Sequence, residues 1–310
     1  MSWLPAADVG TTVTVGTFDG VHLGHQAVIR EIAERARAAG RRSVLVTFDP
    51  HPLEVVNPAA APPRLSTTVE RREMLAQTPL DWMVELRFDH ALAALGPEAF
   101  VRDVLLAGCG MRELVIGHDH GFGRGRSGDA ETLRRLGARH GFAVDVVGPV
   151  EVGGHQVSST LIRRAVAGGD LATARRLLGR PYAVTARVGR GAGRGRQLGV
   201  PTINLADVPA RKLLPPDGVY AVRAEWRGGA AGGMMNQGGR PTFGERARAL
   251  EVHLFGVDAD LYGEWVRVSW VRRLRDVARF ATPEALRAQL DRDRAAAQAA
   301  LADHDHLQRA

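Results

Sequence analysis

The segment that decides the fold of this chain is GTFDGVHLGH, residues 16–25. It follows a short apolar run at residues 12–16 and precedes an amphipathic stretch at residues 26–39 that stops at Gly40. A strand, a glycine-rich loop and a helix in this order let phosphate groups approach the backbone and the positive end of the helix. The segment therefore predicts a phosphate-handling loop at the start of an α/β domain.

Two histidines of this segment are candidates for the chemistry. His22 and His25 are three residues apart, so that both rings face one side of a helical turn. Two imidazoles aimed at one point can stabilise negative charge that develops on a phosphoryl group. Two other interpretations stay open: a turn with two surface histidines, and a metal site with His51 as a third ligand.

The rest of the first half alternates between apolar runs and amphipathic stretches. Strands are expected at residues 43–48, 82–86, 114–117 and 143–147, helices at residues 68–77, 98–107 and 130–140, and a loop at residues 57–65. This alternation predicts a parallel sheet covered by helices on both faces.

Near residue 183 the alternation of apolar runs and amphipathic stretches ends. Short β-like runs follow at residues 183–188, 219–224, 250–255 and 265–270, separated by Gly, Pro and Asn turns. They predict an antiparallel barrel or sandwich. A closing helix is expected after Thr282 as N-cap and Pro283 at the first helical position. We therefore expect two domains, residues 1–182 and 183–310.

Composition narrows the class of protein. The 310 residues carry a formal net charge of +7, nearly all of it from arginine, because Lys212 is the only lysine. A basic balance favours anionic partners, which are nucleic acid, anionic lipid or small phosphates. The single cysteine, Cys109, cannot form an intramolecular disulfide, which fits a cytoplasmic protein. No signal peptide and no run of about 18 apolar residues are found, so no membrane span is expected.

Three further loops of the first half carry polar motifs. TFDPHP at residues 47–52 and GHDHGFGRGRSG at residues 117–128 each follow a predicted strand, at the edge where α/β sheets bind ligands. SSTLIR at residues 158–163 begins a helix, where hydroxyl and backbone N–H groups can hold an anion. Taken singly, these motifs are also compatible with a strand-ending turn, a solvated loop and an ordinary N-cap.

The second half contains its own glycine-rich segment. GRGAGRGRQLGVPTIN at residues 189–204 would let the backbone wrap around phosphates, and its Thr202 and Asn204 offer hard oxygen ligands for Mg²⁺. A linker or an arginine-rich nucleic-acid-binding segment are the alternatives. Glu251, within ALEVH, alternates with its apolar neighbours, so that it faces either a cleft as a general base or water.

In this order, the motifs resemble those of the prokaryotic bifunctional riboflavin kinase/FMN adenylyltransferase (FAD synthetase) family. The resemblance extends through NQGGRPTF, LEVHLF and the closing helix, from about Val13 to Asp293. It implies a Rossmann-like nucleotidyltransferase domain followed by a small six-stranded antiparallel β-barrel with a C-terminal helix. It also implies two ATP-dependent reactions, riboflavin to FMN and FMN to FAD with release of pyrophosphate, with Mg²⁺ accompanying ATP.

The resemblance also implies roles for individual residues. Catalysis falls to His22, His25 and Glu251, and metal binding to Thr202 and Asn204. ATP and phosphate binding falls to Gly16, Phe18, Asp19, Gly24, Ser158, Ser159, Thr160, Arg163, Gly195, Arg196 and Gly199. Flavin binding falls to Asp119, Phe122, Arg126 and Arg275. The sequence departs from the family pattern at His120, where an aromatic residue is usual, and at Ala186 and Ile203.

The expected partners are the small molecules riboflavin, FMN and ATP, without nucleic acid or membrane. Two rival hypotheses are a form in which only the kinase module works and a nucleic-acid-binding protein that uses the arginine-rich loop. The sequence leaves the oligomeric state open.

Overall fold

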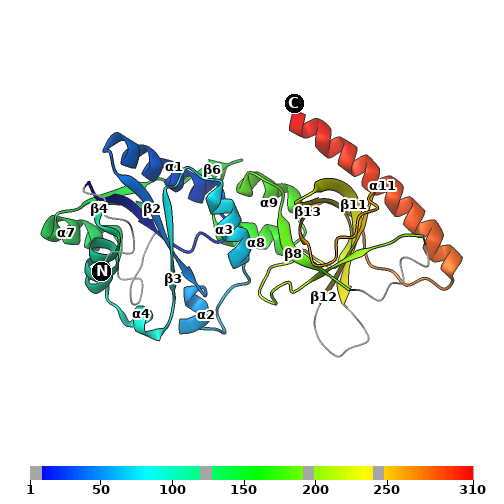
Figure 1. The fold of residues 1–310 in the computed structure, drawn as a ribbon, viewed down its shortest axis with the longest axis horizontal. Helices are drawn as coiled ribbons and strands as arrows, with labels where there is room; N and C mark the ends of the chain where they lie inside the picture. Colours follow the sequence, from blue (N-terminus) through cyan, green and yellow to red (C-terminus); the bar gives the residue numbers. More distant parts are fainter. Residues whose placement is uncertain (1–8, 119–127, 191–198, 240–247, 310) are drawn as a thin grey trace. The chain divides into compact units, whose positions relative to one another are not determined.

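The computed structural model describes residues 9–118, 128–190, 199–239 and 248–309 (Figure 1). The chain forms two units, one of Met1–Arg64 with Thr68–Ser159 and the other of Leu65–Thr67 with Thr160–Ala310. Among the described residues, no helix has both the length and the apolar character needed to cross a lipid bilayer.

A five-stranded parallel sheet forms the centre of the first unit. Its strands are β1 (Thr11–Val15), β2 (Arg42–Asp49), β3 (Trp82–Arg87), β4 (Met111–Gly117) and β5 (Ala143–Val147). They lie in the order β3-β2-β1-β4-β5, and all four neighbouring pairs are parallel. Each strand contains an apolar run, as expected for a sheet that is covered on both faces. The predicted parallel α/β domain is confirmed.

Helices connect these strands. They are α1 (Leu23–Ala38), α2 (Pro52–Val56), α3 (Thr68–Ala76), α4 (His90–Ala94), α5 (Pro97–Ala99), the π-helical segment η1 (Phe100–Leu106), α6 (Ala107–Cys109) and α7 (Ala130–His140). The hairpin β6 (Glu151–Val152) and β7 (His155–Gln156) follows β5. The helix expected at residues 98–107 is therefore a succession of short helical pieces with a π-helical centre.

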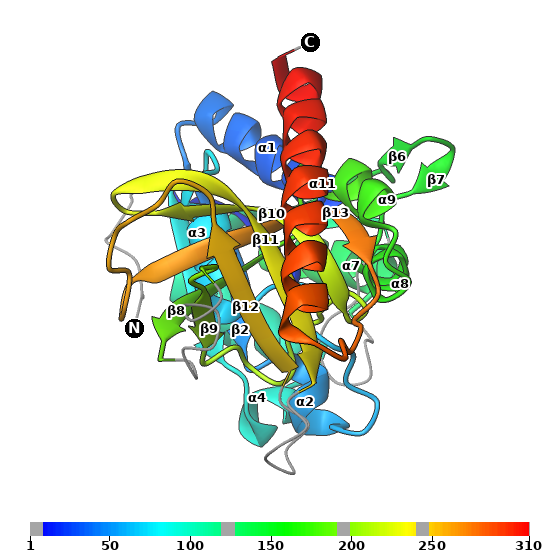
Figure 2. The same cartoon turned by 90° about the vertical axis from the view of Figure 1, so that its right-hand side faces the viewer.

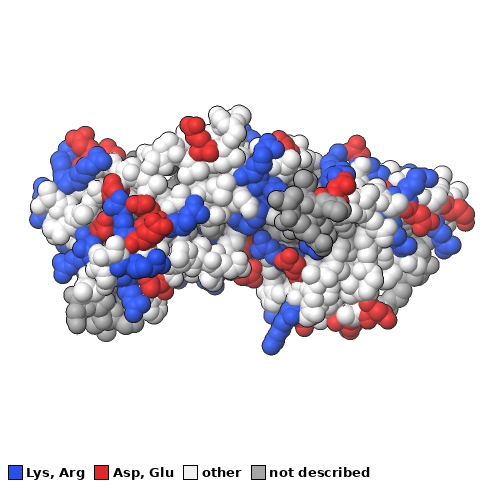
Figure 3. All heavy atoms as spheres, turned by 90° about the horizontal axis from the view of Figure 1, so that it is seen from above, with Lys and Arg blue, Asp and Glu red and all other residues white. Residues whose placement is uncertain are grey.

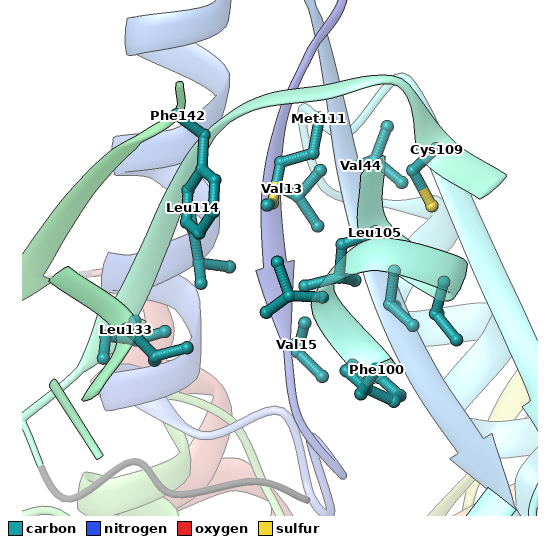
Figure 4. Close-up of a cluster of buried hydrophobic side chains, with 14 of the residues drawn as sticks. Val13, Val15, Val44, Phe100, Leu105, Cys109, Met111, Leu114, Leu133 and Phe142 are labelled. Atoms are coloured by element: carbon teal, nitrogen blue, oxygen red, sulfur yellow. The ribbon is translucent and has the colours of Figure 1, made fainter. Parts of the chain in front are cut away.

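Alternate residues of the central strands enter two separate cores. On one face, Val13 of β1 and Val44 of β2 pack with Phe100 and Leu105 of η1, in the cluster that Figure 4 shows. On the other face, Leu45 packs with side chains of α1 and α3. The period of two along each strand thus divides its apolar residues between two helical layers.

The strand order fixes where a ligand can bind. From β1 the chain moves outward to β2 and β3, and then crosses to the other side of β1 to form β4 and β5. The switch point of this sheet therefore lies between β1 and β4, and ligands of open α/β sheets bind beside the carboxyl ends of strands at such a point. The segment at residues 16–22 follows β1 directly.

The second unit is a closed six-stranded antiparallel barrel. Its strands are β8 (Ala183–Gly189), β9 (Ile203–Ala206), β10 (Gly218–Trp226), β11 (Gly229–Gly239), β12 (Arg248–Leu254) and β13 (Trp265–Arg275), in the order β10-β11-β12-β9-β8-β13. Trp270 and Gln237 are buried in the barrel, where the indole N–H donates to Gln237 Oε1 at 3.2 Å. The predicted barrel is confirmed, and β9 and β11 are strands that the apolar runs did not indicate.

Helix α11 (Pro283–Arg309) covers one side of this barrel, as Figure 2 shows. Ala297 and Ala300 of the helix pack against Ala221 of β10 and Met234 of β11. Helices α8 (Ser159–Ala167) and α9 (Leu171–Leu178) precede the barrel, and from Thr160 onward their contacts group with the second unit. The division between residues 182 and 183 stays a prediction.

Candidate functional site

The loop after β1 turns sharply because its backbone enters the left-handed region three times. Phe18, Gly20 and Val21 have φ values of 48°, 81° and 37°. For Phe18 and Val21 this conformation costs on the order of 1–3 kcal/mol each, and such strain concentrates at ligand-binding loops. Burial of both side chains in the core shared with α1 holds the turn in place.

His22 and His25 lie at the start of the helix that follows. His22 is buried and caps α1, and its Nδ1 accepts a hydrogen bond from the backbone N–H of His25 at 3.3 Å. The two rings stack with centroids 3.6 Å apart and planes 16° apart. The prediction that both rings face one side is confirmed. Two imidazoles at a helix N-terminus, beside the switch point of the sheet, form an arrangement suited to a phosphate chain.

Two glycines of the loop leave room for the aromatic rings of His22 and Phe18. A Cβ on Gly24 would lie 3.2 Å from the His22 ring, and a Cβ on Gly16 would lie 3.0 Å from the Phe18 ring. Both distances are shorter than ordinary van der Waals contact, so larger residues would push the rings out of place. The Gly16 N–H donates to Val46 O at 3.0 Å and ties the loop to β2.

SSTLIR lies partly beside the same loop. Ser159, the first residue of α8, donates from its hydroxyl to the backbone oxygen of Asp19 at 3.1 Å. The prediction that a helix begins in this motif is confirmed. Thr160 and Arg163 continue α8 within the second unit, so their phosphate-binding roles stay predictions, as does that of Ser158.

The motif TFDPHP ends β2 and begins α2. Asp49 Oδ1 accepts hydrogen bonds from Thr68 Oγ1 at 2.9 Å and from Arg64 Nη1 at 3.1 Å. Burial raises the pKa of Asp49, but the hydrogen bonds from Thr68 and Arg64 and the charges of Arg64 and Arg71 together outweigh it and leave the pKa below its usual value. Arg64 also donates to both carboxylate oxygens of Glu54 on α2, at 2.6 and 2.7 Å. This network fixes the backbone immediately after β2.

His51 caps the short helix α2, where its Nδ1 accepts from the backbone N–H of Leu53 at 3.2 Å. Among the residues that the structure describes, no three His, Cys, Asp or Glu side chains gather in the way a metal site requires.

The predicted flavin residues of the first half, Asp119, Phe122 and Arg126, lie outside the described residues, as does His120. Just before them, the exposed ring of His118 is hydrogen-bonded to the side chain of Gln156 on the β6–β7 hairpin. Gly195 and Arg196 of the second half also lie outside the described residues, whereas Gly199 has a φ of +73°.

Glu251 belongs to a row of residues that are direct partners on neighbouring strands of the barrel. On β12, Glu251 is the direct partner of Asn204 on β9 and of Asn236 on β11. Direct partners on neighbouring strands point to the same face with Cβ atoms about 4.5–5.5 Å apart. Glu251 is half-buried, Asn204 is buried, and Thr202 lies immediately before β9. The structure thus makes Glu251 and Asn204 neighbours, and the roles of Glu251, Asn204 and Thr202 stay predictions.

His253, two residues from Glu251, fastens this row to the segment that carries Thr202. Its Nδ1–H donates to Pro201 O at 2.7 Å, and Arg294 of α11 approaches its Nε2 at 3.4 Å. Burial and the Arg294 charge lower the pKa of His253 and outweigh the opposing effect of the Pro201 hydrogen bond. Above a pH of about 6.5 the ring is therefore neutral, and its one N–H donates to Pro201 O.

Arg275, predicted to bind flavin, ends the same row through its partner Val219. Its guanidinium forms a two-pronged ion pair with Asp293 of α11, with N–O distances of 2.7 and 2.9 Å. Asp293 is only 4% exposed, so the pair connects α11 to the rim of the barrel. The side chain of Arg275 is thus held in a fixed orientation at one end of the row.

Charged side chains of both signs are mixed over the face that Figure 3 shows. Several arginines of the first unit are paired with carboxylates, among them Arg35 with Glu31 and Glu113, and Arg71 with Glu85. A surface that binds nucleic acid collects unpaired positive charge on one face. The nucleic-acid hypothesis concerns the arginine-rich loop at residues 189–204, of which residues 191–198 lie outside the described residues, so it stays a hypothesis.

Sequence reasoning missed Arg71, His253 and Asn236 as residues that contact or neighbour the candidate sites. An arginine on a short amphipathic helix indicates a solvated side chain, yet Arg71 is 4% exposed. Asn236 lies in a glycine-rich run with no strand pattern, and its pairing with Glu251 depends on the register of β11. Only the motif LEVH offered a signal for His253.

Comparison with known proteins supports the family resemblance of both halves of the chain. The FAD synthetase family matches residues 4–161, and the riboflavin kinase family matches residues 178–301. The bifunctional riboflavin kinase/FMN adenylyltransferases of Escherichia coli K12 and Pseudomonas fluorescens are 38% and 39% identical to the chain. The alignments cover 93% and 96% of this chain, and 92% and 95% of the relatives.

A solved structure has the same fold over nearly the whole chain. It is titled a macrolide-efflux protein from Streptococcus pneumoniae, with a TM-score of 0.84 and 31% sequence identity over 94% of this chain and 95% of that chain. With two family matches in succession and curated relatives aligned from end to end, this chain belongs to the bifunctional riboflavin kinase/FMN adenylyltransferase family.

Proposed function

We propose that this chain makes FAD from riboflavin in two steps. The first transfers the γ-phosphoryl group of ATP to the 5′-hydroxyl of riboflavin and gives FMN. The second joins FMN to the AMP part of another ATP and releases pyrophosphate. The observation that carries the proposal is the stacked His22–His25 pair at the N-terminus of α1, beside the switch point of a nucleotide-binding type of sheet. Membership of the family supports both steps.

In the adenylyl transfer, the first unit needs no nucleophile of its own, because an oxygen of the FMN phosphate attacks the α-phosphorus of ATP. As the bond to pyrophosphate breaks, negative charge grows on the leaving oxygens. We assign its stabilisation to His22 and His25, which the cap of α1 holds in place. Gly16, Phe18, Asp19 and Gly24 shape the loop around ATP, and Ser159 steadies it through Asp19.

In the phosphoryl transfer, Glu251 is the candidate general base. A primary alcohol is a weak nucleophile, and a carboxylate that accepts its proton assists attack on the γ-phosphorus. Glu251 suits this role because it is half-buried in a row with Asn204, rather than fully solvated. Arg275 lies at the far end of the row, where its orientation is set by Asp293 and where we place the flavin side of the site.

Thr202 and Asn204 fit a Mg²⁺ ion that arrives with ATP. Both offer neutral oxygen donors, two residues apart at the start of β9, and Mg²⁺ with nucleotides takes few protein ligands because phosphates and water complete its shell. When bound, the ion would neutralise charge on the transferring phosphate. His253 holds the preceding Pro201 and thus sets the position of Thr202.

The product assay tests the proposal directly. The purified chain is incubated with riboflavin, ATP and Mg²⁺, and the flavins are separated over time. We expect FMN to appear first and FAD to follow, with pyrophosphate equal to FAD. Accumulation of FMN without FAD at long times would leave only the kinase hypothesis, and absence of both products would refute the proposal. Fragments 1–182 and 183–310 test the predicted division in the same assay.

A further inference from the structure

Arg71 of α3 lies buried under the carboxyl edge of the sheet in the first unit. Its side chain is 5% exposed. Its Nη1–H donates to the backbone oxygen of Thr17 at 3.4 Å, and its Nη2–H donates to the backbone oxygen of Phe48 at 3.0 Å. Thr17 belongs to the loop after β1, and Phe48 lies near the end of β2. One guanidinium therefore contacts the backbone of both segments.

The charge of Arg71 is compensated within the same unit. Its Nη2 also contacts Glu85 Oε2 on β3 at 3.0 Å, and Glu85 accepts further hydrogen bonds from Arg72. A buried cation is tolerated when it is paired and hydrogen-bonded in this way. Compensation alone would require only the carboxylate. The two carbonyl contacts are additional, and they join segments that are far apart in the sequence.

Arg71 contacts the histidine loop (residues 16–25) at Thr17, next to the strained backbone of Phe18. Thr17 lies between Gly16 and Phe18, and its carbonyl oxygen also accepts a hydrogen bond from the hydroxyl of Thr47 at 3.3 Å. Phe18 follows with a positive φ, so the direction of the loop depends on how the Thr17 peptide is held. A shift there moves the whole approach to His22 and His25.

We infer that Arg71 is a positioning residue for adenylyl transfer: it fixes the histidine loop (residues 16–25) against the end of β2. The inference rests on the proposed function of that loop. Arginine suits this task because its planar fork presents several donors at fixed angles, whereas a lysine offers a single point charge. The expected consequence is kinetic, since misplacement by about 1 Å can cost about 10²-fold in rate.

The neighbouring arginine supplies a matched control. Arg72 lies on the same helix and pairs with the same Glu85, but its side chain is 55% exposed, and it acts on Asp49 through its charge, without a hydrogen bond to either segment among the described residues. We compare Arg71→Met, Arg71→Lys and Arg72→Met with the wild type. Two independent measurements are made: amide hydrogen exchange of the segments 16–25 and 47–52, and the steady-state kinetics of FAD formation from FMN and ATP.

For Arg71→Met we expect faster exchange in both segments and a fall in kcat for FAD formation of about 10-fold to 10²-fold, with the KM for ATP changed less than about threefold. Arg71→Lys should lose less, because it keeps the charge opposite Glu85. Arg72→Met should match the wild type in both measurements. Thermal unfolding followed by circular dichroism reports whether the first unit of each variant is folded, because FMN formation is assigned to the second unit.

Unchanged exchange in Arg71→Met, or equal effects in Arg72→Met, would overturn the inference. Faster exchange with an unchanged kcat would also overturn it, because the loop would then not need Arg71 for catalysis. If Arg71→Met fails to fold, the comparison of Arg71→Lys with Arg72→Met decides in the same way. Wild-type protein that makes no FAD would refute the proposed function, and the exchange data would still decide whether Arg71 holds the loop.

Discussion

The two candidate sites differ in how the backbone places their side chains. In the first unit, His22 and His25 follow a strained loop that lies outside the sheet, and a helix cap orients them. In the second unit, Glu251 and Asn204 are neighbours because the strands that carry them are paired. A loop can change without loss of the sheet, whereas a change within a row of strands acts on the site and on the barrel together.

Glu251→Gln is expected to have the largest effect. Glutamine preserves the shape and the position in the row but cannot accept a proton from the riboflavin hydroxyl, so FMN formation should fall by about 10²-fold to 10⁴-fold. FAD formation from supplied FMN should stay within about twofold of wild type. Both rates are measured by flavin chromatography. Glu225→Gln, at an exposed position of β10, is the control. A loss of both steps would contradict the separation of the two sites.

His25→Ala should give the reverse pattern with a somewhat smaller effect. Removal of one group that stabilises transition-state charge costs about 10²-fold to 10³-fold, so FAD formation should fall by that factor while FMN formation continues. Since the loop lies outside the sheet, the thermal unfolding temperature should change little. The control is His140→Ala, at the end of α7 and far along the chain from the loop. Normal FAD formation by His25→Ala would remove this histidine from the site.

Asp293→Asn should affect stability in the barrel. Asp293 is 4% exposed and accepts from Arg275 and from Gln289, so loss of its charge weakens a largely buried ion pair by about 2 kcal/mol. The matched control on the same helix is Asp303→Asn, whose partner Arg272 is 53% exposed, with an expected cost below about 1 kcal/mol. Urea unfolding measures both. Equal costs would mean that the contact between α11 and the barrel rim contributes little.

Many helices and strands of the fold could be predicted from the sequence, and the others form only because of tertiary contacts. The strands of the first sheet are apolar runs that sequence locates within a few residues, and α7 has the predicted bounds at Ala130 and His140. The strand β11, by contrast, has the sequence GAAGGMMNQGG, with no alternation and low β-propensity. It is a strand because β10 and β12 pair with it on both sides.

The residues of the candidate sites could likewise be predicted only in part from the sequence. Motif order located His22, His25, Asn204 and Glu251, because their chemistry depends on residue type and local spacing. The start of α1 at Leu23 rather than Gln26 was missed, since a histidine is not a usual N-cap residue. Arg71 and Asn236 could not be found in this way, because burial under the sheet edge and strand register depend on contacts between distant segments.

The smallest predicted effect concerns His253, which connects the row of Glu251 to Pro201. Its pKa is lowered in the folded protein, so that between the folded and unfolded values the unfolded chain binds more protons. The stabilisation is therefore complete above the unfolded value of about 6.5 and is lost as the pH falls through this value toward the folded pKa. Protonation would also place a positive ring beside Arg294.

His253→Gln removes the titration and retains a side-chain donor for Pro201 O. We expect the free energy of unfolding of the barrel to depend less on pH, as the pH falls below about 6.5, than in the wild type. Urea unfolding is followed by tryptophan fluorescence, to which Trp226, Trp265 and Trp270 on the strands of this unit contribute, and Trp82→Phe in every variant removes the signal of β3 in the first unit. His140→Gln is the control in the first unit. If the pH dependence of His253→Gln equals that of the wild type, the neutral ring does not stabilise the row, and the strand pairs alone hold Thr202 in place.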